Sequence, residues 1–297
     1  MNGKLSVVIS LALAVAGATG GAASVVEEHV AGIIADCLMA AERLRAADPA
    51  AVPMAFWDFD GTIIKGDIGL GFRENGEERY PSLIMESIRA GFSTAYKGES
   101  GARRWRDVDF PHMASLGKWL PQEFDAQMYA GVVASELDAF CARRIREVRY
   151  DRWYFASSMA IWKALAEAGI ENYVVSADVE ALVRNVAPTL GISRDCIHGA
   201  RVENVGGRWS TNLVGPIPCG DGKASVVRKI VEVRPHGFAM AGFGNSYPTD
   251  GAFLRHILQQ QLPGNAKPVS VMINGGEAPP EFKGIFRCVK QEEIVGL

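Results

Sequence analysis

Short apolar runs alternate with longer segments of helical periodicity along most of the chain. The apolar runs end at polar residues or glycines and are too short for helices, which is typical of strands buried on both faces. They cover residues 54–57, 172–175, 237–241 and 269–273. The segments with apolar residues at helical spacing cover residues 25–47, 157–168, 179–190, 223–233 and 251–261. This alternation predicts an α/β fold with a doubly wound parallel sheet.

The segment between the first two predicted strands is far longer than an ordinary crossover. It is mainly helical in pattern, and residues 122–147 form its clearest helix. Connections in compact domains usually have only a few residues, so an insertion of this length predicts a separate helical cap over the sheet. We therefore expect residues 81–149 to form the cap, and residues 24–80 and 150–297 to form the α/β core.

The amino-terminal segment is apolar and almost uncharged. Lys4 is the only charged side chain before Glu27, and an apolar run follows it at residues 5–16. This pattern predicts a secretory signal peptide over residues 1–23 and a periplasmic or secreted protein. The small-residue motifs for cleavage lie at 16–18 and 21–23. The alternative is an uncleaved membrane anchor, because the uncharged run up to Val26 is just long enough to span a bilayer.

The five cysteines form no CxxC pair, which argues against a structural zinc site. An exported protein could instead form up to two disulfides. Cys196 and Cys219 are the preferred pair, because they flank a predicted β-hairpin at residues 196–213 that turns at Gly206-Gly207. The alternative is that all five cysteines are small buried apolar residues.

Two aspartates directly follow the first predicted strand. Residues i and i+2 of an extended chain point the same way, so Asp58 and Asp60 face one site, and Gly61 allows a tight turn after them. Two carboxylates in one site repel each other unless a cation separates them or one takes a proton. A phosphatase uses both solutions. One carboxylate attacks phosphorus, and the other protonates the leaving oxygen and later activates water.

The run Asp58-Phe-Asp-Gly-Thr62 resembles the first motif of the haloacid dehalogenase (HAD) superfamily of phosphatases, and the later motifs follow in the same order. Ser176, at the end of the second predicted strand, resembles the hydroxyl residue of the second motif, and Lys223 resembles the lysine of the third. The resemblance implies a HAD-like Rossmannoid core with a C1-type helical cap. It implies Asp58 as the nucleophile and Asp60 as the general acid and base. It also implies that Ser176, Lys223 and Thr62 bind the phosphate.

Residues 244–250 resemble the fourth motif, which completes a Mg²⁺ site in the superfamily. The implied metal ligands are the carboxylate of Asp58, the backbone carbonyl of Asp60, Asn245 and Asp250. The superfamily usually has an aspartate where this chain has Asn245. A carboxamide oxygen can coordinate Mg²⁺ but adds no charge, so weaker metal binding is expected. Asp250 would either coordinate the ion directly or hold a metal-bound water.

Asp67 stands at the offset where phosphoserine phosphatase-like members have a glutamate that contacts the substrate amino group. The cap and its flank are also rich in aromatic residues, and aromatic faces together with an acid can hold a quaternary ammonium group. These features resemble phosphoserine phosphatase-like and phosphorylcholine phosphatase-like members. The alternatives are helix packing for the aromatic residues and a solvated loop position for Asp67.

The formal net charge of −3 provides no basic field for nucleic acid. We therefore expect a small phosphorylated metabolite as the partner, no nucleic acid, and no membrane once the signal peptide is removed. The expected activity is Mg²⁺-dependent hydrolysis of a small phosphate monoester through an aspartyl-phosphate, and Asp67 leaves an amine-bearing ester open. Asp60 favours a phosphate ester over a C–Cl bond, because a departing chloride needs no proton. The alternatives are a ligand-binding protein that lost turnover through Asn245, and a phosphotransferase.

Overall fold

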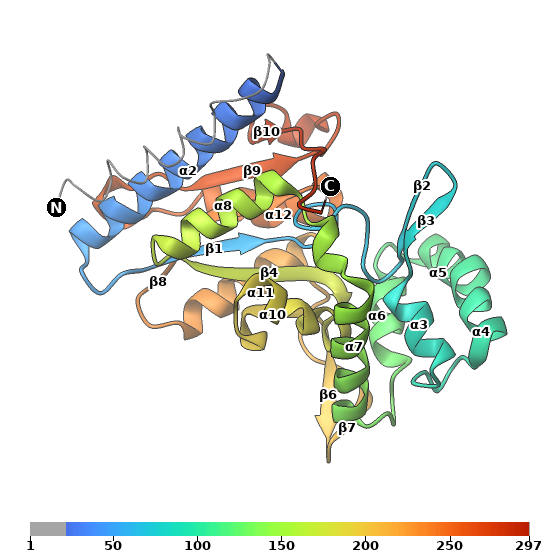
Figure 1. The fold of residues 1–297 in the computed structure, drawn as a ribbon. Coiled ribbons are helices and arrows are strands. Elements are labelled where there is room, and N and C mark those ends of the chain that lie inside the picture. Colours follow the sequence, from blue (N-terminus) through green and yellow to red (C-terminus); the bar gives the residue numbers. More distant parts are fainter. Residues whose placement is uncertain (1–21, 297) are drawn as a thin grey trace.

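The computed structural model describes residues 22–296, with side chains described from residue 28. Its centre is a six-stranded sheet made of β1 (Val52–Trp57), β4 (Glu171–Val179), β5 (Ile197–Ala200), β8 (Gly237–Gly244), β9 (Val269–Ile273) and β10 (Arg287–Val289). The strand order is β10-β9-β8-β1-β4-β5, and every neighbouring pair is parallel (Figure 1). The predicted α/β fold with a parallel sheet is therefore confirmed, and β5 and β10 add an edge strand on each side.

Helices cover both faces of the sheet because successive side chains of a strand point to opposite faces. Met54 and Phe56 of β1 belong to one apolar cluster, together with residues of α11 and α12. Ala55 and Trp57 belong to the other cluster, together with residues of α2 and α8. These helices are α2 (Ala22–Ala47), α8 (Ala156–Glu167), α11 (Asp221–Val233) and α12 (Tyr247–Leu258). β1 thus lies in the middle of a three-layer core, with a strand on each side and helices on both faces.

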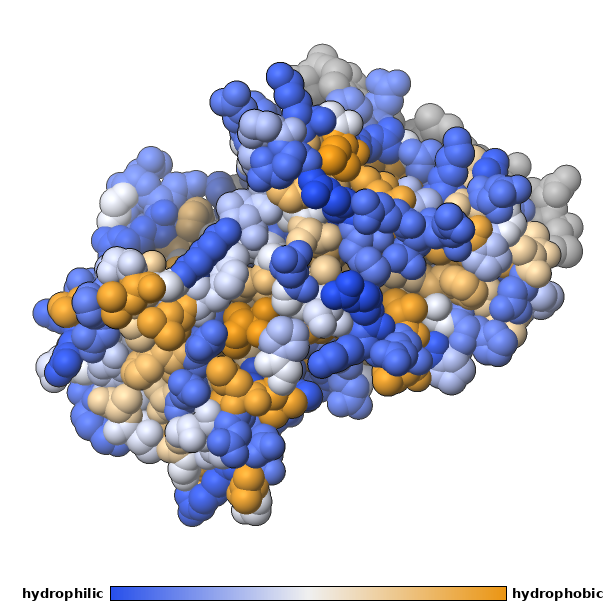
Figure 2. All heavy atoms as spheres, turned by 180° about the vertical axis from the view of Figure 1, so that it is seen from behind, coloured by the Kyte–Doolittle hydropathy of each residue, from blue (hydrophilic) through white to orange (hydrophobic). Residues whose placement is uncertain are grey.

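A helical insertion lies beside the carboxyl ends of the strands (Figure 1). It comprises α3 (Leu83–Arg89), α4 (Gly98–Arg104), the π-helical turn η1 (Trp105–Asp109), α5 (Phe110–Leu116), α6 (Leu120–Gln127) and α7 (Ala134–Val148). The single helix predicted over 122–147 is wrong, because the chain turns between α6 and α7, where Gly131 has a φ of +83°. Figure 2 shows apolar residues gathered on the surface of this insertion, where Val108, Leu116 and Leu120 are exposed.

Two hairpins accompany the insertion. The first, formed by β2 (Phe72–Glu74) and β3 (Glu77–Tyr80), was not predicted from the sequence. The second, formed by β6 (Val202–Val205) and β7 (Arg208–Leu213), confirms the predicted turn at Gly206-Gly207.

The β6–β7 hairpin belongs to the core by sequence but hydrogen bonds to the insertion. The backbone N–H of Trp209 donates to Val132 O (3.0 Å), and the N–H of Gly131 donates back to Trp209 O (2.7 Å). The N–H of Ala134 also donates to Gly207 O (2.9 Å). The link between α6 and α7 is therefore hydrogen-bonded to a hairpin that comes much later in the chain, after β4 and β5.

Three further expectations about local structure need correction. All five cysteines are free, so the preferred Cys196–Cys219 disulfide is absent. The hairpin forms its own two-stranded sheet while β5 pairs with β4, so the flanks of the hairpin are not drawn together.

The helix predicted over 179–190 is broken into α9 (Glu180–Val183), the 3₁₀ turn η3 (Arg184–Val186) and α10 (Ala187–Leu190). Val179, the first residue of the predicted helix, is instead the last residue of β4. The helix predicted over 251–261 begins earlier, because Pro248 occupies the first turn of α12.

The predicted signal peptide lies outside the described residues, apart from its last two positions at the start of α2. Between residues 22 and 296, no helix is both long enough and apolar enough to cross a membrane.

Candidate active site

The three central strands bring their carboxyl ends to one place. β1 lies between β4 and β8, because the chain first adds β4 and β5 on one side of β1 and then returns to add β8, β9 and β10 on the other side. Such a switch point leaves a crevice beyond the strand ends, where α/β proteins bind ligands. Asp58 directly follows β1, Ser176 lies near the end of β4, and Asn245 directly follows β8. Residues of the first, second and fourth motifs therefore meet at one end of the sheet.

Lys223 connects two of the predicted site residues beneath this crevice. It lies in the first turn of α11 and is completely buried. Its Nζ donates to Asp58 Oδ1 at 2.7 Å and to Asp250 Oδ1 at 2.6 Å. Thr62 Oγ1 donates to the other Asp58 oxygen at 2.9 Å. Both oxygens of Asp58 are thus held in fixed directions.

Burial and neighbouring charges determine the protonation of Asp58 and Lys223. Burial, followed by the neighbouring Asp250 carboxylate, raises the pKa of Asp58 to about 6, although Lys223 opposes the shift. Burial disfavours the charged form of Lys223, but the Asp250 and Asp58 carboxylates outweigh it and raise its pKa above the ordinary value. Lys223 therefore stays a cation at neutral pH and compensates the carboxylates beside it.

Asp250 holds the loop after β8 in place. Its Oδ2 accepts the backbone N–H groups of Asn245 (2.9 Å) and Ser246 (3.0 Å). A Cβ on Gly244 would lie 2.6 Å from the Cβ of Asp250, so this close approach requires glycine. Asp250 is fully buried and does not line the pocket described below. Its role as a metal ligand stays a prediction, and these contacts favour the indirect form of that role.

Asp60 is held by the turn that follows it. Its Oδ1 accepts the backbone N–H of Ile68 at 2.7 Å, and its Oδ2 lies 3.4 Å from Ser176 Oγ. Gly61 has a φ of +73°, and a Cβ there would lie 1.9 Å from Asn245 Nδ2. Glycine at this position therefore lets the carboxamide of Asn245 approach the turn that carries both aspartates.

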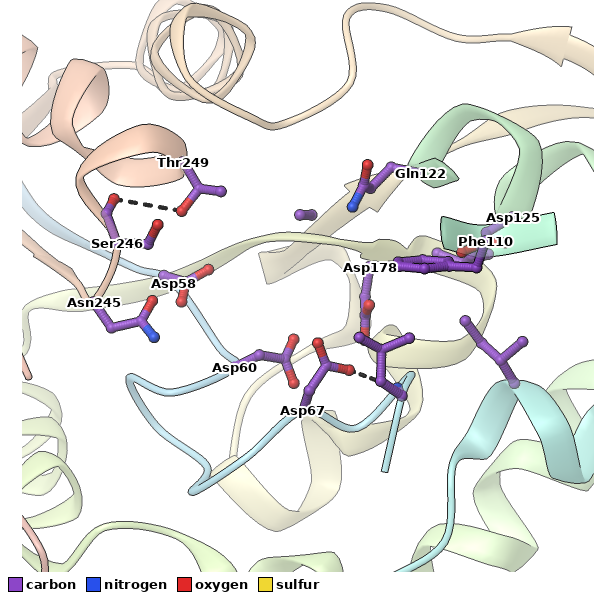
Figure 3. A pocket seen from close by; sticks show the side chains of 14 residues that line it. Asp58, Asp60, Asp67, Phe110, Gln122, Asp125, Asp178, Asn245, Ser246 and Thr249 are labelled. Carbon is purple, nitrogen blue, oxygen red and sulfur yellow. Dashed lines mark hydrogen bonds between the residues drawn. The ribbon is translucent and has the colours of Figure 1, made fainter. Parts of the chain in front are cut away.

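A pocket of about 200 Å³ opens between the strand ends and the insertion (Figure 3). Five aspartates and one asparagine line it, and no Lys, Arg or His does so among the described residues. The core contributes Asp58, Asp60, Asp67, Leu70, Ala177, Asp178, Val179, Asn245, Ser246 and Thr249, and the insertion contributes Ile84, Phe110, Gln122 and Asp125. Thr62, Ser176, Lys223 and Asp250 are fully buried beneath this lining. The pocket wall is therefore strongly acidic.

Three of these carboxylates point toward one another in the pocket (Figure 3). Ligand oxygens of Asp60, Asp67 and Asp178 all lie within 4.8 Å of one another. Backbone N–H groups of one turn, residues 68–70, hold all three, at 2.7, 2.6 and 3.1 Å respectively.

Burial raises the pKa of all three carboxyl groups, and neighbouring charges add to the shift for Asp60 and Asp178. Burial, followed by the charges of Asp178 and Asp67, raises the pKa of Asp60 well above its usual range. Burial raises the pKa of Asp67 to about 6. Burial, followed by the charges of Asp67 and Asp125, raises the pKa of Asp178 well above its usual range. Asp60 therefore holds its proton to a higher pH than an ordinary carboxyl group does.

No role was predicted from the sequence for Asp178, Asp125 or Gln122, which also line this pocket. Asp178 lies two positions after Ser176 in the second motif, which was a usable signal. Asp125 and Gln122 lie on α6, where nothing in the sequence distinguishes them from other polar helix residues. Asp125 accepts the indole N–H of Trp105 at 2.7 Å, and burial raises its pKa to about 7.

The donors in the pocket suit a hard divalent cation. Asp58, Asp60 and Asn245 all offer oxygen atoms, and no His or Cys lines the pocket among the described residues. Oxygen-only coordination is the preference of Mg²⁺. The excess of carboxylates over cationic side chains in this lining also favours a cation, so the residues present fit the predicted metal.

Two solved structures share this fold with the chain at low sequence identity. A protein of unknown function from Bordetella pertussis Tohama I aligns at 16% identity with a TM-score of 0.59, covering 81% of this chain and 99% of that one. A functionally unknown protein from Anaerococcus prevotii DSM 20548 aligns at 13% identity with a TM-score of 0.59, covering 88% and 91%. A substrate-bound phosphoserine phosphatase aligns at 11% identity with a TM-score of 0.40, covering 80% and 92%.

No curated protein matches the sequence. The sequence model of the haloacid dehalogenase-like hydrolases, however, matches residues 55–255, which include the end of β1, the insertion, Lys223 and the loop after β8. With the motif residues gathered at the strand ends and this match over most of its length, the chain belongs to the haloacid dehalogenase-like hydrolase family.

Proposed function

We propose that this hydrolase removes the phosphoryl group from small phosphate monoesters. The observation that carries the proposal is the pairing of two differently held carboxylates at one pocket. Asp58 is fixed by Lys223 and Thr62, and Asp60 has its pKa raised by burial and neighbouring acids. Two carboxylates with different environments can serve as nucleophile and as general acid.

The first step forms an aspartyl-phosphate. A carboxylate oxygen of Asp58 attacks phosphorus, the ester P–O bond breaks, and Asp60 gives its proton to the departing alkoxide. In the second step, water attacks phosphorus, Asp60 takes a proton from that water, and the P–O bond to Asp58 breaks. The products are the alcohol and inorganic phosphate, and both aspartates return to their starting forms.

The residues beneath the pocket orient this chemistry. Lys223 compensates the charge of Asp58, so that a phosphate dianion can approach. Thr62 keeps the Asp58 carboxylate in one orientation through its hydrogen bond. Ser176 is proposed to donate to a phosphoryl oxygen, which requires its hydroxyl to leave the long contact with Asp60. Asp67, which lines the pocket, is proposed to contact the substrate.

Magnesium would be held by the Asp58 carboxylate, the Asp60 backbone carbonyl and Asn245, with Asp250 holding the Asn245 loop. When bound, the ion would neutralise charge on the phosphoryl oxygens. Asn245 adds no charge to this set, so we propose weaker metal affinity than an aspartate would give.

We also propose that residues 1–23 direct export and that residues 81–149 act as a cap that excludes water from the pocket. The apolar run after Lys4 supports export, and the insertion supplies one wall of the pocket. Expression in a bacterium with a periplasm, followed by mass analysis of the product, tests export. A periplasmic product that starts near residue 19 or 24 is expected, and a full-length product in the membrane would contradict export.

Phosphate release from an aryl phosphate tests the activity. Release is expected with Mg²⁺, should stop with excess EDTA, and should be abolished in Asp58→Asn. Asp195→Asn is the matched control, because Asp195 is exposed and remote from the pocket. Metal-independent release, or full activity in Asp58→Asn, would refute the proposal. Ligand binding without turnover would favour the non-catalytic alternative, and a new ester formed with added alcohols would favour phosphotransfer.

A further inference from the structure

We infer that the preferred leaving group is a small amino alcohol that carries a primary ammonium and no carboxylate. The ammonium would lie between Asp178 and Asp125, and Gln122 would accept one of its N–H groups. This inference rests on the proposed phosphatase function and specifies its substrate class.

The charge of the pocket calls for a second cation besides a metal ion. A divalent ion beside Asp58 and Asp60 leaves the other three aspartates of the lining without a cationic partner, since no Lys, Arg or His of the described residues lines the pocket. Hydrogen-bond donors alone hold Asp67, Asp178 and Asp125, and carboxylates removed from water are costly when no cation compensates their charge. A substrate ammonium would provide that compensation on the side of the pocket away from Asp58.

Asp125 is the carboxylate of the insertion that a substrate cation would contact. It is only 4% exposed, although it lines the pocket. One of its oxygens accepts the Trp105 indole N–H, and the other accepts no hydrogen bond from residues 28–296. It comes from the insertion, and it approaches the pocket from the side opposite Asp60 and Asp67 (Figure 3). A cation placed between the two walls would contact acids on both.

Gln122 specifies the kind of cation. Gln122 lines the pocket, and its Oε1 is buried and has no hydrogen-bond partner within the described part of the chain. A buried acceptor without a donor costs about 1–3 kcal/mol, which a ligand N–H would recover. A primary ammonium has three N–H groups, whereas a trimethylammonium has none. The pocket should therefore prefer an ethanolamine-type leaving group over a choline-type one.

The same lining disfavours a carboxylate on the substrate. An amino acid phosphate would place an anion among aspartates with no cationic side chain to receive it. Like charges at such distances repel. The volume of about 200 Å³ also limits the leaving group to a few heavy atoms, because drug-sized ligands occupy about 300–1,000 Å³.

Four esters separate these features: phosphoethanolamine, phosphocholine, phosphoserine and ethyl phosphate. We expect kcat/KM for phosphoethanolamine to exceed that for each of the other three by about 10-fold or more, the size of one charge-assisted hydrogen bond. Equal or higher kcat/KM for phosphocholine would overturn the role of Gln122. Equal or higher kcat/KM for phosphoserine would overturn the argument from the acidic lining.

Variants of α6 test the residues themselves. Asp125→Asn keeps an acceptor for Trp105 but removes the charge, and Gln122→Leu removes the acceptor. Each should lower the ratio of kcat/KM for phosphoethanolamine to that for ethyl phosphate by about 10-fold. Glu123→Gln is the matched control, because Glu123 is on the same helix but does not line the pocket. An unchanged ratio in both pocket variants would overturn the inference.

Failure of the proposed function would look different. In that case, the wild type would hydrolyse none of the four esters. Calorimetric titration of the same esters into the wild type would then decide the inference alone. Tighter binding of phosphoethanolamine than of ethyl phosphate, lost in Asp125→Asn, would support the subsite, and equal binding would overturn it.

Discussion

Replacing Lys223 with methionine removes the only side-chain cation that contacts Asp58 or Asp250 in the described residues. The methionine fills most of the same volume but loses the hydrogen bonds of 2.7 and 2.6 Å. Asp250 is 0% exposed and Asp58 is 5% exposed, so water cannot replace the lost cation. Breaking a buried pair by removing one partner typically costs about 3–5 kcal/mol. Because two carboxylates share this cation, we expect the free energy of unfolding to fall by about 5 kcal/mol.

A partly exposed pair in the same chain provides the control. Lys65 Nζ lies 2.8 Å from Glu74 Oε1, nearly the same distance, but these side chains are 30% and 34% exposed. Exposed pairs contribute about 0–1 kcal/mol, so Lys65→Met should cost no more than about 1 kcal/mol. The two variants therefore differ mainly in burial.

Urea unfolding in EDTA, followed by circular dichroism and tryptophan fluorescence, measures both variants without a bound metal. Lys223→Met should unfold at a much lower urea concentration than Lys65→Met. Adding Asp250→Asn to Lys223→Met should recover part of the loss, because one uncompensated carboxylate is then removed. If Lys223→Met costs as little as Lys65→Met, the buried ion pairs do not stabilise the fold as argued.

Three further predictions concern His198, Gly61 and the cysteines. Burial lowers the pKa of His198 to about 4, so the unfolded state binds the extra proton between pH 6.5 and 4, and stability falls as the pH falls through that window. His198→Phe should reduce this loss in urea unfolding at pH 7 and 4.5, and equal losses would refute it. Gly61→Ala should lose about 1–3 kcal/mol in thermal unfolding and also lose phosphate release, because its Cβ would clash with Asn245. Gly76→Ala, with a φ of +83° but open space around it, should keep phosphate release. Denatured protein should titrate five thiols without reductant, and fewer would reveal a disulfide.

The sequence predicted the sheet and its polar edge well, for a physical reason. The apolar run at 54–57 has no amphipathic pattern, so it fits only a central strand covered on both faces. A parallel sheet then places every residue that follows such a strand at the same edge. The meeting of Asp58 with Lys223, far apart in the chain, follows from this rule and from the order of the motifs.

The insertion could not be predicted to the same depth. Asp125 is buried because α6 packs beside η1, where Trp105 supplies its donor, and helix packing of this kind leaves no local sequence pattern. The strands β2 and β3 consist largely of charged residues without alternation, so no period of two was visible. Residue-level contacts in the pocket therefore depend on tertiary packing, which local patterns do not encode.

The hydrogen bonds between the β6–β7 hairpin and the α6–α7 link affect how this protein can be recombined with relatives. A chimera that exchanges residues 81–149 alone would separate Trp209 from Val132 and Gly131. Trp209 is buried, and a buried backbone group left without a partner costs about 1–3 kcal/mol. The exchangeable unit is therefore discontinuous, and a graft that also carries residues 202–213 would preserve the backbone pairing on which the donor helices depend.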